Sequence, residues 1–430
     1  MNYTDAVAYL DRHIGQGVRP GLERISALLD LMANPEAGYP IIHIAGSNGK
    51  TSTARIATFL LAAHGLKVGT FTSPHLERIE QRFALSGVDL TREEFADAVE
   101  DVAPFADLLQ EQIGDPPTYF ELTAAVAFGL FAEKAVDVAV VEVGLGGRLD
   151  ATNAADGKVA VVTSISREHT DYLGETLAEI AREKLAITKP DSVLVLGKLP
   201  PEALSEAEKV REALGVRAVA LTRDFDVEPT MAVGGWTIDI DGVYGRYEGV
   251  FIPAHGRHQT RNTAVAAVAV EEMLGRPLVP EAVIEAMAEL TLPGRLEVLG
   301  RRPLLVLDGA HNAEGFELLG GVLAEEFPAL KWTLVFGVRG DKDLETMIGS
   351  LATQLRTVVT CAADSPRVVP APEVADRVRG VLGSATEVIT SSGVAEAVDI
   401  ALAQTEPDGA VLVTGSLYVV GEARTHLRDG

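Results

Sequence analysis

The chain has 430 residues, of which 47% are hydrophobic, and a formal net charge of −25. This length and composition allow two or three packed domains and exclude global disorder, and the acidic balance argues against nucleic-acid binding. The single cysteine, Cys361, cannot form an intrachain disulfide. The N-terminus lacks the basic and apolar regions of a signal peptide, and the apolar runs are too short to span a bilayer. We therefore expect a cytoplasmic protein that binds neither nucleic acid nor a membrane.

The first half of the chain predicts alternating strands and helices. Two amphipathic helices, at 3–14 and 21–32, precede a short apolar strand at 41–45. The later elements are a helix at 54–63, a strand at 67–72, helices at 91–112 and 119–133, strands at 137–143 and 159–165, a helix at 176–187 and a strand at 192–197. This rhythm is typical of a parallel sheet with helices on both faces.

The second half changes character after Thr222. Short alternating segments at 224–253, with glycine turns, predict antiparallel strands added to the first domain. Helices at 258–274 and 280–290 follow, and Leu292-Pro293-Gly294-Arg295 is the expected hinge. Strands at 304–307, 332–336, 357–361, 387–389 and 410–414, separated by helices, predict a smaller Rossmann-like α/β domain. We therefore expect an α/β protein with domains at 1–292 and 296–430.

The strongest local motif follows the first strand and reads Gly46-Ser47-Asn48-Gly49-Lys50-Thr51-Ser52. Glycines let backbone N–H groups turn toward an anion, and the start of the next helix adds positive potential. Lys50 is expected on the β- and γ-phosphates of a nucleotide, and a hydroxyl of Thr51 or Ser52 on magnesium. The usual first glycine of a phosphate loop would fall at Ile44, so this is a tighter form. The alternative is a plain turn between strand and helix.

Several further blocks occur in one order along nearly the whole chain. They are Thr72-Ser73-Pro74-His75-Leu76, residues 141–153, 169–174 and 180–184, Gly256-Arg257-His258-Gln259 with Asn262, Pro293-Gly294-Arg295 and residues 307–312. Together with the glycine loop they resemble the dihydrofolate synthase/folylpolyglutamate synthase family of the Mur-ligase superfamily. The blocks at 72–76 and 142–153 point to the folate branch. The resemblance implies an ATP-dependent ligase that joins L-glutamate to dihydropteroate or to a reduced folate through an acyl phosphate.

The resemblance also implies a metal site with two magnesium ions. Its ligands are Ser73, Glu142, His169 and a Lys184 carbamylated by carbon dioxide. From the residues alone, Lys184 beside Arg182 and Glu183 on a helix would be solvent-exposed. Glu142 would be an ordinary strand-end carboxylate. The family commonly has aspartate where Glu168 stands, so this chain has a longer side chain beside the implied ligands.

Further roles follow from the same resemblance. Asn262 matches a residue that contacts adenine, Arg295 and Asp308 match phosphate and ribose contacts, and His311 would close on the phosphates, so that ATP lies between domains. The implied catalytic residues are Lys50, Lys184 and His311. The acceptor candidates are Phe120, Glu121, Thr123, Leu149, Asp150 and Ala151, with the loop around Gly21-Leu22. Phe120 is equally well explained as a core residue. Loose candidates for the glutamate carboxylates are Lys331, Arg339, Lys342 and Arg367.

Three alternatives stay open on the sequence. One is a monofunctional folylpolyglutamate synthase, which would not accept dihydropteroate. Another is a different amide ligase of the Mur superfamily. The third, from a different class, is a nucleotide-binding regulatory protein without ligase activity, which would predict the loss of Glu142, His169 or Lys184, and all three are present. We expect a monomer.

Overall fold

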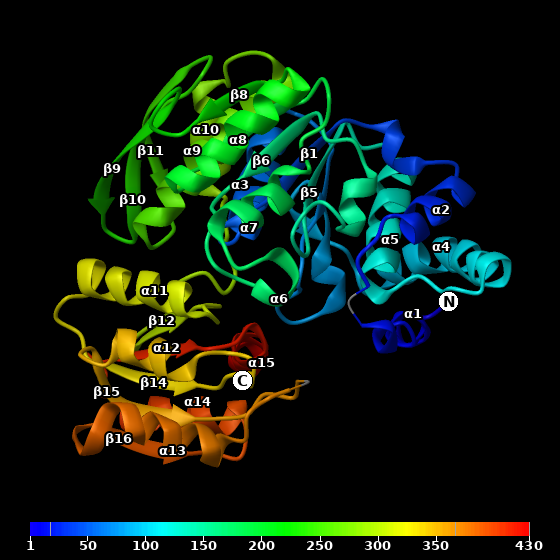
Figure 1. The fold of residues 1–430 in the computed structure, drawn as a ribbon. Helices are drawn as coiled ribbons and strands as arrows, with labels where there is room; N and C mark the ends of the chain where they lie inside the picture. The colour runs from blue at the N-terminus through cyan, green and yellow to red at the C-terminus, as the bar shows by residue number, and fades with distance from the viewer. Residues whose placement is uncertain (18, 366, 430) are drawn as a thin grey trace. The chain divides into compact units, whose positions relative to one another are not determined.

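The computed structural model describes residues 1–17, 19–365 and 367–429, and the chain divides into two compact units (Figure 1). The first unit contains residues 1–232, 236–253 and 258–290. The second contains residues 233–235 and 254–257 and the chain from Thr291 onward.

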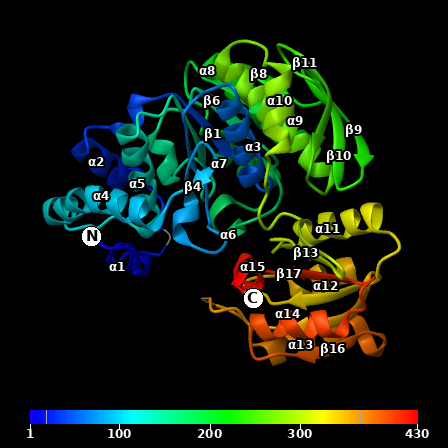
Figure 2. The ribbon, with the colours of Figure 1, turned by 180° about the vertical axis from the view of Figure 1, so that it is seen from behind.

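An eight-stranded sheet forms the centre of the first unit, in the order β4-β3-β2-β5-β1-β6-β7-β8 (Figures 1 and 2). The six strands from β2 to β8 in this order are parallel, and β3 and β4 are antiparallel additions at one edge. The strands are β1 (Ile41–Ala45), β2 (Val68–Phe71), β3 (Phe83–Leu85), β4 (Val88–Asp89), β5 (Val138–Glu142), β6 (Val159–Val162), β7 (Val193–Leu196) and β8 (Arg217–Ala220). Their continuous apolar runs suit strands that are buried on both faces.

Helices cover both faces of this sheet, with α7 and α8 on one face and α3 and α9 on the other (Figures 1 and 2). The helices are α1 (Tyr3–Asp11), α2 (Glu23–Leu31), α3 (Lys50–Ala63), α4 (Arg92–Ile113), α5 (Tyr119–Glu133), α6 (Thr170–Leu173), α7 (Leu177–Leu185), α8 (Pro201–Leu214), α9 (Arg257–Leu274) and α10 (Pro280–Ala288). Helix α4, predicted over 91–112, opens with a capping box in which Thr91 and Glu94 exchange side-chain and backbone hydrogen bonds.

Two apolar clusters meet on one face of β1. Side chains alternate along a strand, so Ile41, His43 and Ala45 point to the same face. Ile41 belongs to a cluster formed largely by α4 and α5. Ala45 belongs to a second cluster, formed largely by α7 and α8. His43 therefore lies at the boundary between the two clusters.

A small three-stranded sheet completes the first half of the chain, as predicted. Its order is β11-β10-β9, and β10 pairs antiparallel with β11. Its strands are β9 (Asp226–Ala232), β10 (Gly235–Asp241) and β11 (Arg246–Ile252).

The second unit is built on a six-stranded mixed sheet in the order β12-β13-β17-β14-β15-β16. Only the β12–β13 pair is antiparallel. The strands are β12 (Glu297–Arg301), β13 (Leu304–Leu307), β14 (Trp332–Phe336), β15 (Leu355–Thr360), β16 (Glu387–Thr390) and β17 (Ala410–Thr414). The helices are α11 (Ala313–Glu326), α12 (Leu344–Leu351), α13 (Ala371–Leu382), α14 (Val394–Gln404) and α15 (Leu417–Asp429).

The structure differs from the sequence-based assignment at several elements. Helix α3 begins at Lys50 rather than 54, because Gly49 takes a left-handed backbone (φ +86°) and lets the helix start directly after the loop. The prediction has no counterpart for β3, β4 and β12. These strands have two to five residues, which is too short for a readable alternation. It also leaves residues 198–222 unassigned, where α8 and β8 form.

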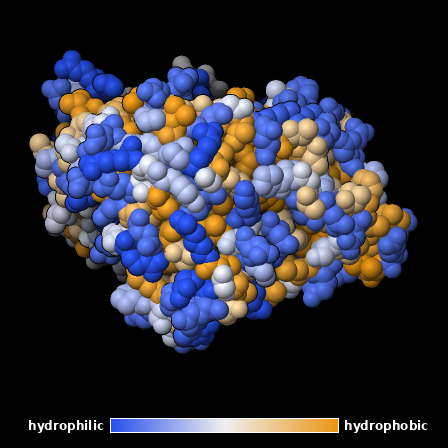
Figure 3. Space-filling view, turned by 90° about the horizontal axis from the view of Figure 1, so that it is seen from above, coloured by the Kyte–Doolittle hydropathy of each residue, from blue (hydrophilic) through white to orange (hydrophobic). Residues whose placement is uncertain are grey.

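On the face drawn in Figure 3, hydrophilic residues are interspersed with smaller apolar areas. Within the part of the chain that the structure describes, no helix combines the length and the apolar character that crossing a membrane would need.

An ion pair between β12 and α15 gives a test of the second unit. Arg424 and Glu297 form a bidentate pair with N–O distances of 2.9–3.0 Å, and their side chains are 9% and 17% exposed. Replacing Arg424 by alanine would leave a largely buried carboxylate without this partner. We expect a loss of about 3 kcal/mol in the free energy of unfolding of this unit. Urea unfolding followed by Trp332 fluorescence in a Trp236→Phe background measures it.

Arg302→Ala is the matched control. Its partner is Asp408, and the two side chains are 80% and 89% exposed. Solvent already screens this pair, so the expected change is below about 0.5 kcal/mol. Similar losses in both variants would contradict the importance of the buried pair.

Candidate active site

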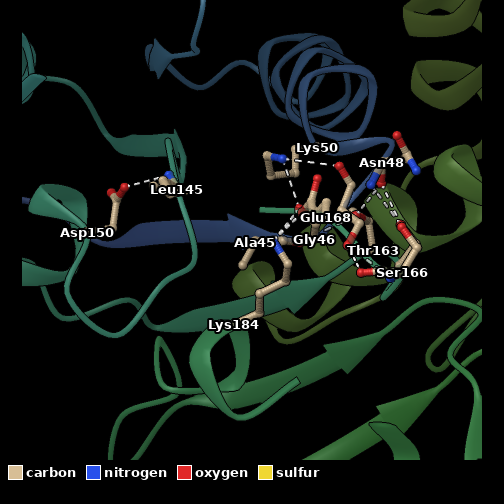
Figure 4. A network of polar contacts seen from close by, with 12 residues as sticks. Ala45, Gly46, Asn48, Lys50, Leu145, Asp150, Thr163, Ser166, Glu168 and Lys184 are labelled. Carbon is tan, nitrogen blue, oxygen red and sulfur yellow. Dashed lines mark hydrogen bonds and ion pairs between the residues drawn. The ribbon is translucent and has the colours of Figure 1, made fainter. Parts of the chain in front are cut away.

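The loop between β1 and α3 has the geometry of an anion-binding loop. Its backbone turns at Gly46 and Gly49, and α3 begins at the next residue, so the free N–H groups of the helix start face the loop. The Lys50 ammonium donates to the carbonyl oxygens of Gly46 at 2.8 Å and Ser47 at 3.4 Å (Figure 4). A flexible cation thus lies directly at a helix N-terminus, an arrangement suited to phosphate.

Residues after β6 anchor the loop, and the sequence analysis missed them. The hydroxyls of Thr163 and Ser164 donate to the Asn48 carbonyl at 2.7 and 3.0 Å. The backbone N–H of Ser166 donates to Ser47 Oγ at 3.0 Å. A Cβ atom at Gly46 would lie 1.9 Å from Thr163 Oγ1, so only glycine fits there. The run of hydroxyl residues directly after a strand next to β1 could have indicated this role.

Glu142, at the carboxyl end of β5, connects the loop to the segment after β2. Its side chain is buried, and it accepts hydrogen bonds from Thr51 Oγ1 at 3.0 Å and from the Ser73 backbone N–H at 3.2 Å. A carboxylate beside a hydroxyl suits magnesium, which prefers oxygen ligands. The structure therefore brings together Thr51, Ser73 and Glu142, three residues predicted to lie at a magnesium site.

His169 completes the predicted metal set less directly. It precedes α6, is exposed, and has a left-handed backbone (φ +46°). Among the described residues, no group of three or more His, Cys, Asp or Glu side chains is close enough to hold a metal by itself. A metal site here would therefore depend on hydroxyl and modified-lysine ligands as well.

Lys184 on α7 is buried, with 2% of the side chain exposed, so the expectation from its helix neighbours was wrong. The residues Ile180, Ala181, Lys184 and Leu185 form the buried face of α7, and helical spacing alone could have shown this. The Lys184 ammonium pairs with Glu168 Oε1 at 2.7 Å and donates to the Gly46 carbonyl at 3.1 Å (Figure 4). Two lysines, Lys50 and Lys184, thus converge on one carbonyl oxygen.

This convergence changes the acid–base properties of the site. Burial, followed by the nearby charge of Lys50, lowers the pKa of Lys184 to about 8. Burial alone would raise the pKa of Glu168, but Lys184 and Lys50 together bring it below its usual value. The pair therefore keeps an anionic carboxylate beside an amine that loses its proton more easily than an ordinary lysine.

Helix α9 brings Asn262 to the glycine loop. A Cβ atom at Gly49 would lie 2.7 Å from Asn262 Oδ1, and Asn262 Nδ2 donates to Gln259 Oε1 at 3.0 Å. The predicted adenine residue thus lies beside the predicted phosphate loop, although more than 200 residues separate them in the sequence.

The acceptor candidates fall into two groups. Phe120 is partly buried, and its ring lies against Gly144, where a Cβ atom would be 2.4 Å from Cζ; Leu149 is partly exposed. The other four are buried and have internal positions: Glu121 pairs with Arg24, Thr123 donates to the Phe120 carbonyl, Asp150 accepts from Leu145 and Thr152, and Ala151 packs in the core. In Figure 4, Asp150 and Leu145 lie apart from the two lysines.

In the second unit, the predicted residues gather at the carboxyl end of β13. Asp308 accepts from the backbone N–H groups of Leu296 and Ala310, both at 2.9 Å. Arg295 lies close enough that a Cβ atom at Gly309 would be 2.4 Å from Nη1. His311 is exposed, and its Nδ1 is 2.8 Å from the Gly309 carbonyl.

The loose glutamate candidates do not share one end of the sheet. Lys331 precedes β14 and donates to the Thr353 carbonyl at 2.6 Å. Arg339 and Lys342 follow β14 and both pair with Asp341, and Arg367 follows β15. The backbone joins Gly340 N–H to the Arg367 carbonyl at 2.9 Å. Pro366, which precedes Arg367 in the sequence, lies outside the described residues.

Comparisons with known proteins agree with this fold. The Mur ligase middle domain matches residues 44–270, and the Mur ligase, glutamate ligase domain matches residues 294–417. The dihydrofolate synthase/folylpolyglutamate synthase of Mycobacterium tuberculosis is 36% identical over 95% of this chain and 90% of its own length. The Escherichia coli protein of the same name is 31% identical, over 96% and 93%.

Solved structures give the same result. Mycobacterium tuberculosis folylpolyglutamate synthase complexed with ADP and AMPPCP has a TM-score of 0.92 at 35% identity, covering 99% of each chain. Escherichia coli FolC in complex with DHPP and ADP has a TM-score of 0.87 at 28% identity, covering 100% of this chain and 98% of that one. Fold and phosphate loop define an ATP-dependent ligase of the Mur type. Within that class, the chain belongs to the dihydrofolate synthase/folylpolyglutamate synthase family.

The contact between Gly49 and Asn262 gives a test of the nucleotide site. Gly49→Ala would place a methyl group against Asn262 and strain a left-handed backbone. We expect the affinity for AMPPCP to fall at least about tenfold, since a cost of 1.4 kcal/mol is already tenfold. Isothermal titration calorimetry measures it.

Gly65→Ala is the matched control, because Gly65 has nearly the same φ (+81°) and open space around it. Both variants carry backbone strain, but only one disturbs Asn262. The expected affinity of Gly65→Ala is within about twofold of the parent, which is below 0.5 kcal/mol. Equal losses in both variants would show that general strain, and not this contact, determines the effect.

Proposed function

We propose that the protein is an ATP-dependent amide ligase that adds L-glutamate to dihydropteroate and to reduced folates, including their glutamylated forms. The observation that carries this proposal is the joint arrangement of the glycine loop, Lys50 and the Glu142–Thr51 contact at one end of the sheet. The names of relatives that match almost the full chain support the choice of substrates. Residues 1–292 would bind ATP, and residues 296–430 would act as the glutamate-ligase domain.

The reaction follows from elementary chemistry. A carboxylate is a poor electrophile, so an acceptor carboxylate oxygen first attacks the γ-phosphorus of ATP and ADP leaves. The glutamate amine then attacks the acyl carbon, the C–O bond to phosphate breaks, and the amine loses a proton as the amide forms. Phosphoryl transfer requires alignment and charge neutralisation. Lys50 and the backbone of Ser47–Ser52 would supply both.

The other nucleotide contacts are assigned on position and resemblance. Asn262 lies beside the loop and would contact adenine. Arg295 and Asp308, at the end of β13, would contact phosphate and ribose, and His311 would act on the phosphates from the same segment. Arg339, Lys342 and Arg367 have the charge to hold glutamate carboxylates.

The residues present fit two magnesium ions. Thr51, Ser73, Glu142 and His169, with Lys184 in a carbamylated form, would hold them. Magnesium supplies a Lewis acid that neutralises developing charge on phosphate. The protein's own contribution includes the hydrogen bonds on Glu142, which hold Thr51 and Ser73 beside the carboxylate.

We further propose that Lys184 is carbamylated and that the protein acts as a cytoplasmic monomer. Carbamylation needs a neutral amine, and the burial of Lys184 beside Lys50 favours that form. The modification joins the Nζ atom to the carbon of CO₂ and releases one proton. The buried free thiol of Cys361 suits a reducing compartment.

The first test compares the two acceptors. With ATP and glutamate, we expect phosphate release and a glutamylated product, confirmed by mass, from both dihydropteroate and tetrahydrofolate. Glu142→Gln should lower kcat at least about 100-fold, because the amide lacks the negative charge with which the carboxylate would hold magnesium at the phosphates. Glu202→Gln, exposed on α8, is the control and should change nothing. Products from tetrahydrofolate alone would favour a monofunctional enzyme, and products from neither would refute the folate assignment.

The second test detects the carbamate directly. Protein equilibrated with ¹³C-bicarbonate near pH 8, where about half of the Lys184 amines are neutral, should show one ¹³C carbamate signal by NMR. The signal should disappear in Lys184→Arg and remain in Lys189→Arg, a control at a lysine near the end of α7. A carbamate signal that remains in Lys184→Arg would refute the modification of Lys184. The lack of any carbamate signal from the parent protein with ATP and magnesium would refute it as well.

A further inference from the structure

A buried polar chain runs from the central strand to the segment after β5. His43, in the middle of β1, has 1% of its surface exposed. Its Nε2 atom is 2.9 Å from Thr152 Oγ1, and Thr152 Oγ1 is 2.5 Å from Asp150 Oδ1. All three side chains are buried. Such a series of polar groups is unusual at the boundary between two apolar clusters, where the apolar side chains of Ile41 and Ala45 lie on either side of His43.

The direction of the hydrogen bonds can be deduced. Asp150 accepts from the Thr152 hydroxyl, which uses the only hydrogen of that hydroxyl. His43 must then donate from Nε2, so its neutral ring carries the proton there, and Nδ1 is a bare acceptor. No hydrogen-bond partner of Nδ1 is found among the described residues. Burial, with Lys189 nearby, lowers the pKa of His43 to about 3, so the ring stays neutral at working pH.

The hydrogen-bonded series from His43 through Thr152 to Asp150 ends in the segment 144–153, which we call the acceptor loop. Asp150 holds the loop closed by accepting from the backbone N–H groups of Leu145 at 2.8 Å and Thr152 at 3.0 Å. It also caps the short helix Ala151–Ala154. The positions of the Leu145 and Thr152 N–H groups therefore depend on the orientation of the Asp150 carboxylate. The hydrogen bond from the Thr152 hydroxyl, which in turn accepts from His43, fixes that orientation.

A second side of the acceptor loop is fixed by α7. Arg148 N–H donates to the Glu183 carbonyl at 2.8 Å, and Asn153 Nδ2 lies 3.4 Å from the Ala186 carbonyl. Lys189 Nζ donates to the Asn153 carbonyl at 3.0 Å. The loop is thus held by the sheet through His43 and by the end of α7. Its tip at Leu149 is partly exposed, and the Phe120 ring lies against its first residue, Gly144.

We propose that His43 is a positioning residue for the acceptor: through Thr152 and Asp150 it sets the conformation of the acceptor loop, and with it the binding of the pterin substrate. This inference rests on the proposed function, because it takes the surface formed by Phe120 and Leu149 as the acceptor site. It separates two roles of β1. The end of the strand leads into the phosphate loop, whereas its middle controls the acceptor loop.

A purely structural role for His43 is disfavoured by its chemistry. A buried polar group with an unpaired acceptor destabilises a core relative to an apolar side chain of similar size. Leucine or phenylalanine would continue the packing of Ile41 and Ala45. The His43 ring instead forms one directed hydrogen bond to Thr152. A directed hydrogen bond fixes the conformation of a loop, whereas apolar packing does not.

The test removes the hydrogen bond at either end. His43→Phe keeps a ring but has no donor, and Thr152→Val keeps the shape but has no hydroxyl. We expect each to weaken the binding of dihydropteroate, and to raise its KM, about tenfold, while the affinity for AMPPCP stays within about twofold. Equilibrium dialysis, calorimetry and steady-state kinetics give these quantities, and thermal unfolding confirms that each variant is folded.

Conservative variants provide the controls. His43→Gln can still donate from Nε2, and Thr152→Ser keeps the hydroxyl, so both should stay within about threefold of the parent for dihydropteroate. The double variant His43→Phe/Thr152→Val should bind dihydropteroate no more weakly than the single variant with the lower affinity, because both substitutions interrupt the same series of hydrogen bonds. If His43→Phe does not fold, the pair Thr152→Val and Thr152→Ser makes the same comparison.

The outcomes separate this inference from the proposed function. Unchanged dihydropteroate binding in folded His43→Phe and Thr152→Val, or equal losses for dihydropteroate and AMPPCP, would overturn the positioning role. A parent protein that binds dihydropteroate but forms no glutamylated product would refute the ligase proposal alone. A parent protein that does not bind dihydropteroate would overturn both.

Discussion

The carboxylate of Glu142 is the group on which the site depends. A buried carboxylate is destabilising unless hydrogen bonds and positive charge surround it. Here its two oxygens accept from Thr51 on α3 and from the backbone of Ser73 after β2. Because β2, β5 and β1 are adjacent parallel strands, their carboxyl ends meet at one edge of the sheet. One carboxylate can therefore connect three segments that lie far apart in the sequence.

The two lysines at this edge are opposed in charge to that carboxylate but repel each other. Both ammonium groups donate to the Gly46 carbonyl, so neither can move away without losing a hydrogen bond. The Glu168 carboxylate compensates the positive charge of the buried Lys184, with Oε1 at 2.7 Å from the Lys184 Nζ atom. The family resemblance implied aspartate at this position, and glutamate has the longer side chain. In the unmodified protein this edge holds two cations in place, and after carbamylation of Lys184, Lys50 would remain as the fixed positive charge that reduces the reorganisation needed for phosphoryl transfer.

The sequence was informative where chemistry is local. The glycine loop, the apolar strands and the capping box at Thr91 could be predicted because each depends on neighbouring residues. The burial of Lys184 follows from the helical spacing of Ile180, Ala181 and Leu185, whereas its charged neighbours Arg182 and Glu183 favour exposure. The anchoring of Asn48 by Thr163 and Ser164 could not be derived, because it depends on which strand lies next to β1. Strand order is a property of the whole fold.

The acceptor side shows a different limit. The family resemblance implied that Glu121 and Asp150 lie near the substrate, but a matching motif does not show which way a side chain points. In the structure, Glu121 pairs with Arg24 and Asp150 closes its own loop. The oxygens of such a carboxylate are already occupied by internal hydrogen-bond donors. The carboxylate then acts on a ligand mainly by fixing the shape of the surface that the ligand contacts. The specificity of such a site then depends on what holds the carboxylate, and here that support reaches back through Thr152 to a histidine in the central strand.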